Sequence, residues 1–300
     1  MNTINVQCIF DGICRLAEGP IWNVKLQKLF WTDIFEKRLW VYDPCTGKSQ
    51  IFWEGEHMVG GCAFTRKGNL VLCTDKGIYL LETHKTNNIN VMPRKLLNIT
   101  LRKNERFNDI IVDPKGRIYA GTWLNGEEDS VLYKLEKNKT PIPVVRGIGG
   151  SNGMAFSMDE NFFYHTDSRK YTISRYKYYS DTGEIAEPEI YYKGEEKDGV
   201  PDGITIDAED YIWVAFWGTS VIRRFSPKGK IDQEIPLPAK QPTSVTFGGK
   251  DLRDLYITTA SEGAIDVRKG FDKEGGFLGG NVYKLHVEFS GRADWPAGFD

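Results

Sequence analysis

A stretch in the middle of the chain decides the fold: residues 152–178 read NGMAFSMDENFFYHTDSRKYTISRYKY. Apolar and polar residues alternate through three short segments of this stretch, and turn-forming residues separate the segments. Alternation with a period of two, together with β-branched and aromatic residues, is typical of antiparallel strands and not of helices. The connections are two to four residues long, which suits tight turns. The stretch therefore predicts three consecutive antiparallel strands.

The same plan recurs along the chain. Residues 202–226 read DGITIDAEDYIWVAFWGTSVIRRFS, which is again a polar start, an alternating strand, a turn and two further strands. A repeat of roughly 45 residues with strand periodicity is the signature of a β-propeller blade. Six blade starts can be aligned, each with a short polar or glycine turn. They are Glu18-Gly19-Pro20, Gly60-Gly61-Cys62, Asn108-Asp109-Ile110, Asn152-Gly153-Met154, Asp202-Gly203-Ile204 and Thr243-Ser244-Val245.

These repeats predict an all-β fold, a six-bladed β-propeller with four-stranded antiparallel blades. Six blades account for residues 1–300 as a single domain, since closed all-β folds often reach this length as one unit. No window of eleven or more residues has convincing helical periodicity. A propeller must close its ring, and we expect the N-terminal strand to pair into the last blade beside residues 280–287.

Composition and charge narrow the classes of partner. The formal net charge of −2 gives no reason to expect nucleic acid or an anionic membrane as partner. The N-terminus does not resemble a signal peptide, and no apolar run is long enough for a membrane span. The five cysteines are odd in number and contain no CxxC pair, which favours reduced thiols and a cytoplasmic protein. We expect a monomer or a weak homodimer that acts on a small molecule.

Four of the blade starts carry an oxygen-bearing side chain. Corresponding ends of the innermost strands surround the central channel of a propeller, so these side chains should converge near its axis. Two carboxylates and two amides suit a hard divalent cation such as Ca²⁺, and gathering the carboxylates without one would be costly. Zinc, manganese, magnesium or iron remain alternatives, although the four histidines lack the usual metal-ligand spacing. The four side chains are Glu18, Asn108, Asn152 and Asp202.

Each of these residues also has a purely structural interpretation. Asn or Asp before glycine is common in turns, so Asn152 or Asp202 taken alone would be unremarkable. Glu18 is harder to dismiss because glutamate is not a favoured turn residue, and the shared phase across blades favours a functional site. Arg106 lies two residues before Asn108, on the same face of an extended segment, and could hold an anionic or polyhydroxyl ligand. Its alternative is a surface arginine beside Glu105.

Other motifs fail in their context. Residues 149–153 match the G-x-S-x-G nucleophile pattern, but that elbow precedes a helix and here a strand follows, so Ser151 is expected to be a loop residue. Residues 147–150 are glycine-rich without a following helix that could bind phosphate. Asp33, Asp75 and Asp167 recur at the ends of second strands, where an architectural role in the blade turns is expected.

The blade-start motifs resemble those of the senescence-marker-protein/gluconolactonase family, which includes regucalcin. The resemblance rests on LAEGPIW at 16–22, RFND at 106–109, SNGMAFS at 151–157 and PDG at 201–203, and it runs from about residue 16 to 286. That family consists of six-bladed propellers that hydrolyse sugar-acid lactones with one divalent cation in the channel. The resemblance implies hydrolysis of an aldonolactone such as glucono-, xylono- or arabinono-lactone.

The resemblance also implies roles for individual residues. Glu18, Asn152 and Asp202 would be the metal ligands, Arg106 and Asn108 would bind substrate, and Asp202 would double as general base. Glu127 or Glu128 would supply an acidic substrate contact, and Trp123 stands where many relatives have methionine. Two other functions stay open, a non-catalytic calcium-binding regulatory propeller and a phosphotriesterase-like hydrolase. A WD-repeat scaffold is disfavoured because its Gly-His and Trp-Asp signatures are missing.

Overall fold

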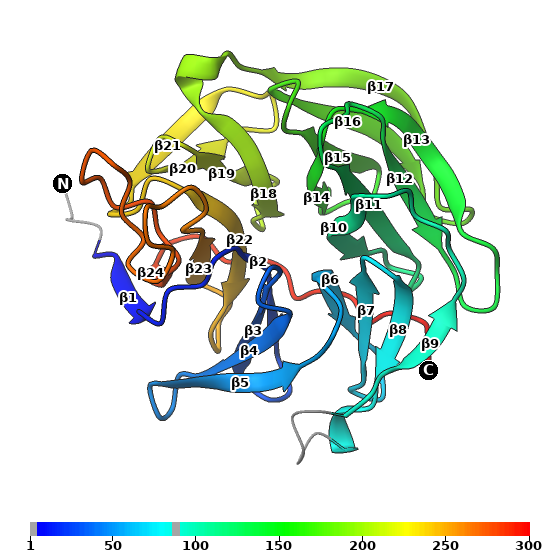
Figure 1. Cartoon of the computed structure of the whole chain (residues 1–300). Coiled ribbons are helices and arrows are strands. Elements are labelled where there is room, and N and C mark those ends of the chain that lie inside the picture. The colour runs from blue at the N-terminus through cyan, green and yellow to red at the C-terminus, as the bar shows by residue number, and fades with distance from the viewer. Residues whose placement is uncertain (1–4, 86–90) are drawn as a thin grey trace.

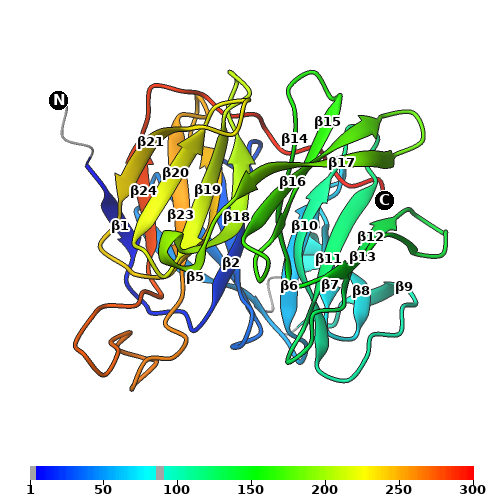
Figure 2. The ribbon, with the colours of Figure 1, turned by 90° about the horizontal axis from the view of Figure 1, so that it is seen from above.

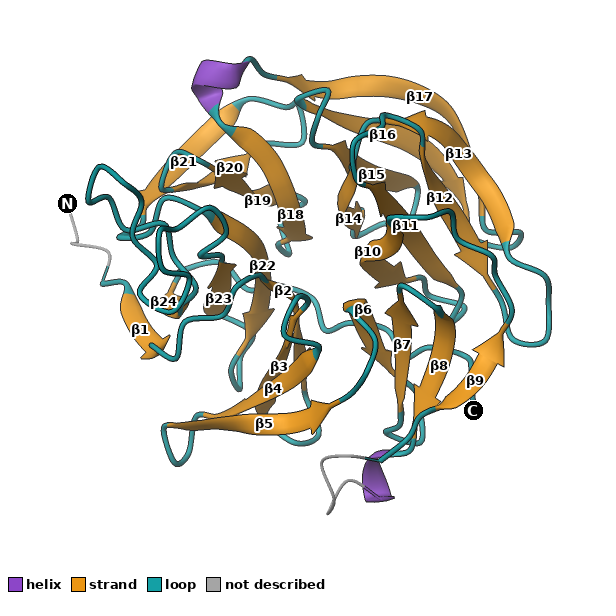
Figure 3. Cartoon of the chain, in the orientation of Figure 1, coloured by secondary structure: helices purple, strands orange, loops and turns teal. Residues whose placement is uncertain are grey.

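The computed structural model describes residues 5–85 and 91–300. It is a β-propeller in which six four-stranded antiparallel sheets are arranged around a central axis (Figure 1). Within the described ranges the helices are two short 3-10 turns, Thr83–Lys85 and Glu196–Asp198, and the rest is strand and loop (Figure 3). No helix in this part of the chain has the length and apolar character that crossing a bilayer requires. The predicted fold class is confirmed.

Each blade runs outward from an innermost strand at the axis to an edge strand at the periphery. Blade 1 comprises β2 (Ala17–Asn23), β3 (Lys28–Asp33), β4 (Arg38–Asp43) and β5 (Lys48–Glu54). Blade 2 comprises β6 (Val59–Phe64), β7 (Leu70–Thr74), β8 (Gly77–Leu81) and β9 (Arg94–Leu97). Blade 3 comprises β10 (Glu105–Val112), β11 (Ile118–Leu124), β12 (Ser130–Leu135) and β13 (Ile142–Ile148).

The second half of the ring repeats the plan. Blade 4 comprises β14 (Ser151–Phe156), β15 (Phe162–Asp167), β16 (Thr172–Tyr179) and β17 (Glu184–Lys193). Blade 5 comprises β18 (Val200–Ile206), β19 (Ile212–Trp217), β20 (Val221–Phe225) and β21 (Ile231–Pro236). Blade 6 comprises β22 (Pro242–Gly248), β23 (Asp254–Thr259), β24 (Val282–His286) and, from the other end of the chain, β1 (Gln7–Phe10).

The N-terminal strand closes the ring, as predicted. Strand β1 pairs antiparallel with β24, with Gln7 opposite Lys284 and Cys8 opposite Tyr283. Its hydrogen bonds cover an edge of blade 6 that would otherwise be an open template for pairing. Closure therefore places the first strand and the last strand of the chain side by side in one sheet.

The last residues of the chain form a second closure, which the sequence did not predict. The C-terminal segment, residues 287–300, passes across the ring at the end of the blades where innermost and second strands are joined (Figure 2). It exchanges backbone hydrogen bonds with hairpins of four blades, and Arg292 donates to carbonyl groups of a fifth. The contacted residues are Phe64 in blade 2, Gly116 in blade 3, Phe156 and Ser157 in blade 4, Ala208 in blade 5, and Leu252 and Arg253 in blade 6.

The hydrophobic core lies between neighbouring blades. Trp213 and Ala215 of blade 5, for example, pack in one buried cluster with Val245 and Phe247 of blade 6. Fully burying a large apolar side chain contributes roughly 1.5–3 kcal/mol, so each blade is stabilised mainly by its neighbour. This arrangement fixes the innermost strands relative to one another, and it therefore fixes what they carry at the axis.

All six innermost strands share a local irregularity at the blade start. The pairing register with the second strand shifts in each blade, in blade 1 between Glu18 and Ile21 and in blade 4 between Ser151 and Met154. Such bulges bend a strand and redirect its side chains, and they are common beside functional sites. The six bulges aim the first residues of the strands at the axis.

The aspartates at the ends of second strands hold these starts in place, in keeping with the predicted architectural role. Asp33, Asp75 and Asp167 each accept hydrogen bonds from backbone N–H groups just before the innermost strand of the same blade. The donor–acceptor distances lie between 2.9 and 3.2 Å. The donors are Arg15 and Leu16, then Met58, then Gly149 and Gly150.

Candidate functional site

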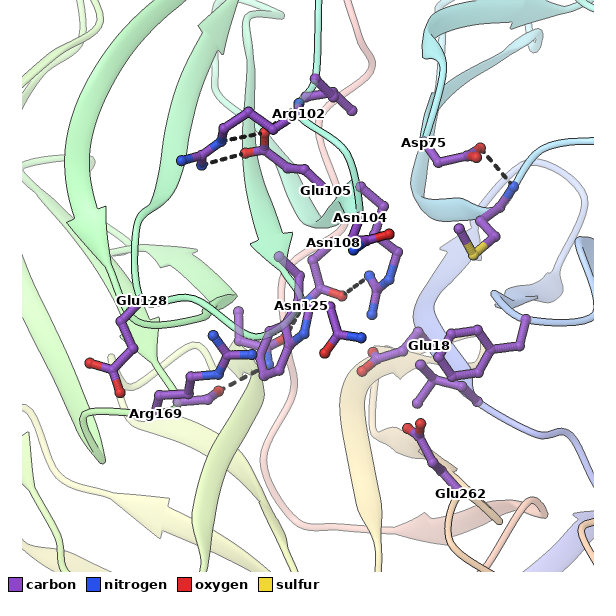
Figure 4. A pocket seen from close by; sticks show the side chains of 18 of the residues that line it. Glu18, Asp75, Arg102, Asn104, Glu105, Asn108, Asn125, Glu128, Arg169 and Glu262 are labelled. Carbon is purple, nitrogen blue, oxygen red and sulfur yellow. Dashed lines mark hydrogen bonds and ion pairs between the residues drawn. The ribbon is translucent and has the colours of Figure 1, made fainter.

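The four side chains that the sequence predicts at the axis do meet there. They line one cavity at the blade-start end of the channel, with a volume of about 1160 Å³. Figure 4 labels Glu18 and Asn108 among the lining side chains. All four are buried, with exposed fractions of 3 to 6%. Arg106, the predicted ligand-binding arginine, lines the same cavity and is 9% exposed. The four are Glu18 of β2, Asn108 of β10, Asn152 of β14 and Asp202 of β18.

A chain of hydrogen bonds orients the amides across three blades. Arg106 Nη1 donates to Asn108 Oδ1, and Asn108 Nδ2 donates to Asn152 Oδ1 at 2.8 Å. Asn152 Nδ2 in turn donates to Ser168 Oγ at 2.9 Å, and that hydroxyl donates to the Pro201 carbonyl at 2.7 Å. With Nδ2 committed to Ser168, the Asn152 carbonyl oxygen is held beside Asn108 with a lone pair to spare.

The two carboxylates lie in an environment that disfavours their ionised forms. Burial raises the pKa of Glu18 well above its ordinary value, and the charges of Asp202 and Asp109 raise it further. Burial likewise raises the pKa of Asp202, with Asp109 adding to the shift and Arg106 opposing it. Two buried carboxylates near one another cannot both be ionised cheaply without a compensating positive charge. Arg106 supplies part of it.

Asp109 is a member of this charge cluster that the sequence analysis did not single out. Its side chain is buried, and burial raises its pKa to about 7, with Arg106 acting in the opposite direction. Strict alternation would place Asp109 on the opposite face from Asn108. The bulge in β10 between Phe107 and Ile110 breaks that alternation. The sequence therefore offered only two indications that Asp109 belongs to the cluster, its carboxylate and its position in the turn at a blade start.

The residues present fit a hard divalent cation. Asp202 Oδ1 is buried and has no hydrogen-bond partner among the described residues, which is unusual for a carboxylate oxygen. Glu18 and Asp202 of this cavity, with Asp109 of the adjoining cavity, would carry a charge of −3 when ionised, against +1 on Arg106. The donors are oxygens, as Ca²⁺ or Mg²⁺ prefers. Within residues 5–85 and 91–300 no set of three His, Cys, Asp or Glu side chains is arranged so that it could hold a metal ion, so a cation held here would need an amide oxygen beside the carboxylates.

Further residues of the cavity wall come from the loop after β11. Asn125 and Glu128 line the cavity, whereas Glu127 is not among the lining residues described. Of the two glutamates that the sequence left as alternatives for a substrate contact, Glu128 is the one that lines the cavity. Glu262, which follows β23, lines the cavity from the other side. Burial lowers the pKa of Arg106, and the charges of Glu18 and Glu262 oppose that shift.

The Ser151 motif proves to be structural. Ser151 is the first residue of β14, so its prediction as a loop residue was wrong. Gly121 in β11 of the neighbouring blade lacks a Cβ and so makes room for the Ser151 side chain. Its Oγ lies 2.7 Å from His165 Nε2, and both residues are buried. Neither lines the cavity that holds Glu18 and Asp202, so the pair has no access to a substrate there.

His165 should make the stability of the protein depend on pH. Burial lowers the pKa of His165 from 6.5 to about 4, with Asp167 opposing the shift. The unfolded chain therefore binds more protons than the folded one between these values, and stability should fall as the pH drops from about 6.5 to about 4. Over this pH range the wild-type protein should lose roughly 3 kcal/mol more of its free energy of unfolding than His165→Gln does. Urea unfolding of both proteins at several pH values measures this difference. Equal pH profiles would contradict the assignment.

Comparison with known proteins finds relatives along nearly the whole chain. A family model described as the SMP-30/Gluconolactonase/LRE-like region matches residues 16–261. The pentonolactonase XacC of Haloferax volcanii is 32% identical over 293 residues, covering 97% of this chain and 98% of the relative. Regucalcin of Danio rerio is 32% identical over 266 residues, covering 87% and 88%. The solved structure of a luciferin-regenerating enzyme superposes with a TM-score of 0.90 at 28% identity, covering 98% and 99%.

Proposed function

The chain belongs to the SMP-30/gluconolactonase/LRE-like family, and from that premise we propose that it hydrolyses the lactone of a sugar acid to the free acid. One divalent cation, held by Glu18, Asn152 and Asp202, would assist the reaction. The observation that carries the proposal is the buried Asp202 oxygen without a hydrogen-bond partner, beside Glu18 at the floor of the cavity. A site that gathers buried carboxylates with only one arginine to offset their charge is suited to a cation and a small ligand.

The side chains of the cavity have separate roles in this mechanism. Glu18, Asn152 and Asp202 would hold the cation, which would supply Lewis-acid polarisation of the lactone carbonyl. Water adds to the carbonyl carbon, and the Asp202 carboxylate accepts a proton from it as general base. The bond between the carbonyl carbon and the ring oxygen then breaks, and the proton passes to the ring oxygen as it becomes a hydroxyl. Arg106 and Asn108 bind the sugar hydroxyls and hold the lactone in line for attack.

We propose an aldonolactone such as glucono-, xylono- or arabinono-lactone as substrate. The cavity wall offers planar donors and acceptors in Arg106, Asn108 and Asn125, which suit a ring with several hydroxyl groups. The similarity to a pentonolactonase over nearly the whole chain supports this class. Ca²⁺ is the proposed cation because all three ligands are oxygens, and Zn²⁺, Mn²⁺, Mg²⁺ and Fe²⁺ are the alternatives to test.

One experiment tests the proposal directly. The protein is depleted of metal with a chelator, dialysed and resupplied with each divalent ion, and each form is assayed on the three aldonolactones. We expect turnover to disappear on depletion and to return with at least one ion. A parallel titration of the depleted protein by calorimetry measures metal affinity without reference to turnover.

The same titration separates the two competing functions. Tight Ca²⁺ binding without hydrolysis of any lactone would favour a non-catalytic calcium-binding propeller. Metal-dependent cleavage of a phosphotriester in place of the lactones would favour a phosphotriesterase-like hydrolase. Lactone hydrolysis that persists after complete depletion would contradict the metal-dependent mechanism.

A further inference from the structure

Trp123 forms a wall of the cavity beside the proposed site. It lies in β11 directly opposite Arg106 of β10, so the two side chains project from the same face of blade 3. Its ring also packs against the start of β14, where Asn152 lies. A Cβ on Gly150 would lie only 2.4 Å from the ring, so the glycine is what permits this close approach. The indole therefore belongs to a residue paired with the proposed substrate arginine, and it packs against the residue just before the strand that carries a proposed metal ligand.

Arg169 of blade 4 fixes this wall from the other side. Its guanidinium carbon lies 4.5 Å from the centroid of the Trp123 ring, in range of a cation–π interaction. Its Nη1 donates to the carbonyl groups of Leu124 and Gly149 at 3.1 Å each, and also to that of Glu127. Figure 4 shows the arginine reaching toward the cavity wall from the blade 4 side. One guanidinium thus holds both the indole and the loop that follows it.

The far end of that loop has its own attachment. Arg102 Nη1 donates to Asp129 Oδ2 at 2.8 Å, and its other nitrogens bind the buried carboxylate of Glu105. The segment from Leu124 to Asp129 is therefore tied at both ends, and Asn125 and Glu128 of this segment line the cavity. A wall tied in this way cannot yield to a larger ligand without breaking several charge-assisted hydrogen bonds.

We propose that Trp123 is a specificity-determining residue that sets the size of the lactone, and that Arg169 is its positioning residue. The inference rests on the proposed function and deepens it. A lactone held by Arg106 and Asn108 would have the indole beside it, so a hexonolactone would place its additional carbon and hydroxyl against the ring that Arg169 and Gly150 pack on. The protein is expected to prefer five-carbon lactones.

The test measures kcat/KM for a hexonolactone and a pentonolactone in wild-type and variant proteins. Trp123→Ala should raise the hexonolactone-to-pentonolactone ratio by roughly 10- to 200-fold, which is the range for one carbon-sized group in an apolar pocket. Trp123→Phe should move the ratio less. Arg169→Met keeps the Trp123 ring but removes the guanidinium that packs against it. This variant should shift the ratio in the same direction by a smaller factor, and it should raise KM more than it lowers kcat.

Phe162→Ala is the matched control. Phe162 also lies under an arginine, with the guanidinium carbon of Arg175 4.7 Å from the ring centroid, but it is at the opposite end of β15 from the site. Its loss should leave the ratio unchanged. If Trp123→Ala does not fold, as judged by circular dichroism, Trp123→Met provides the same test with a smaller cavity. A ratio unchanged in a folded, active Trp123 variant would overturn the inference.

Failure of the proposed function gives a different result. In that case the wild-type protein hydrolyses neither lactone, and calorimetry with the five- and six-carbon aldonate anions replaces the assay. If Trp123→Ala binds the six-carbon aldonate more tightly than wild type does, without a similar gain for the five-carbon aldonate, the size-setting role is still supported. Equal affinities in wild type and variant would refute it.

Discussion

Replacement of Asp202 by Asn should lower kcat/KM for the lactone by roughly a thousandfold or more. Loss of a general base alone typically costs 10²- to 10⁴-fold, and the substitution also removes one of two proposed carboxylate ligands. The amide has nearly the same shape, so packing around the residue is retained. Steady-state kinetics on the best lactone, with calorimetric titration of the metal, measures both losses.

Although Asp202→Asn should lose activity, its stability without metal should not fall. The pKa of Asp202 is raised because its ionised form is buried beside Asp109, so the metal-free protein is destabilised by this charge at neutral pH. Removing the charge should leave the melting temperature of the metal-free protein unchanged or higher. Asp251→Asn, at an exposed turn in blade 6, is the control that changes neither property. Wild-type turnover in Asp202→Asn would exclude the residue from the mechanism.

The sequence was sufficient to predict which strand ends meet at the axis. Glu18, Asn152 and Asp202 are far apart in the chain, but a propeller places corresponding residues of its repeats in one ring. Once the repeat was recognised, its phase alone predicted the convergence that the cavity now shows. Strand β1 was predictable on similar grounds, because a ring of sheets requires closure and only a terminal strand remained unassigned.

Features that depend on contacts between different parts of the chain were not predictable in this way. The C-terminal segment carries no repeat, and its hydrogen bonds to hairpins across the ring follow from the assembled shape. The inclusion of Asp109 in the charge cluster depends on a bulge that strand periodicity cannot reveal. Arg169 reaches the loop after Trp123 from the next blade. Neither residue lies in a sequence motif that would have predicted their contact.

Glycine at position 153 links the fold to the site, and its replacement should disrupt both. A Cβ at Gly153 would lie 2.4 Å from the Ile204 nitrogen and 2.5 Å from the Asp202 carbonyl oxygen. Both atoms belong to the backbone of β18, so no side-chain rotation can relieve the clash. The two innermost strands would have to separate, and Asn152 would move away from Asp202. Two of the three proposed ligands are therefore affected by a single methyl group.

We expect Gly153→Ala to lower metal affinity and lactone turnover by more than about a hundredfold and to destabilise the fold by roughly 1–3 kcal/mol or more. Urea unfolding, calorimetry and the lactone assay give the three measurements. The control is Gly47→Ala in an outer hairpin of blade 1, where φ is +66° and no atom lies within 4 Å of the added Cβ. That variant carries only the left-handed backbone cost of about 1–2 kcal/mol and should retain full activity. A Gly153→Ala protein as stable and active as wild type would show that β14 and β18 do not approach so closely, and the ligand geometry proposed for Asn152 and Asp202 would have to be abandoned.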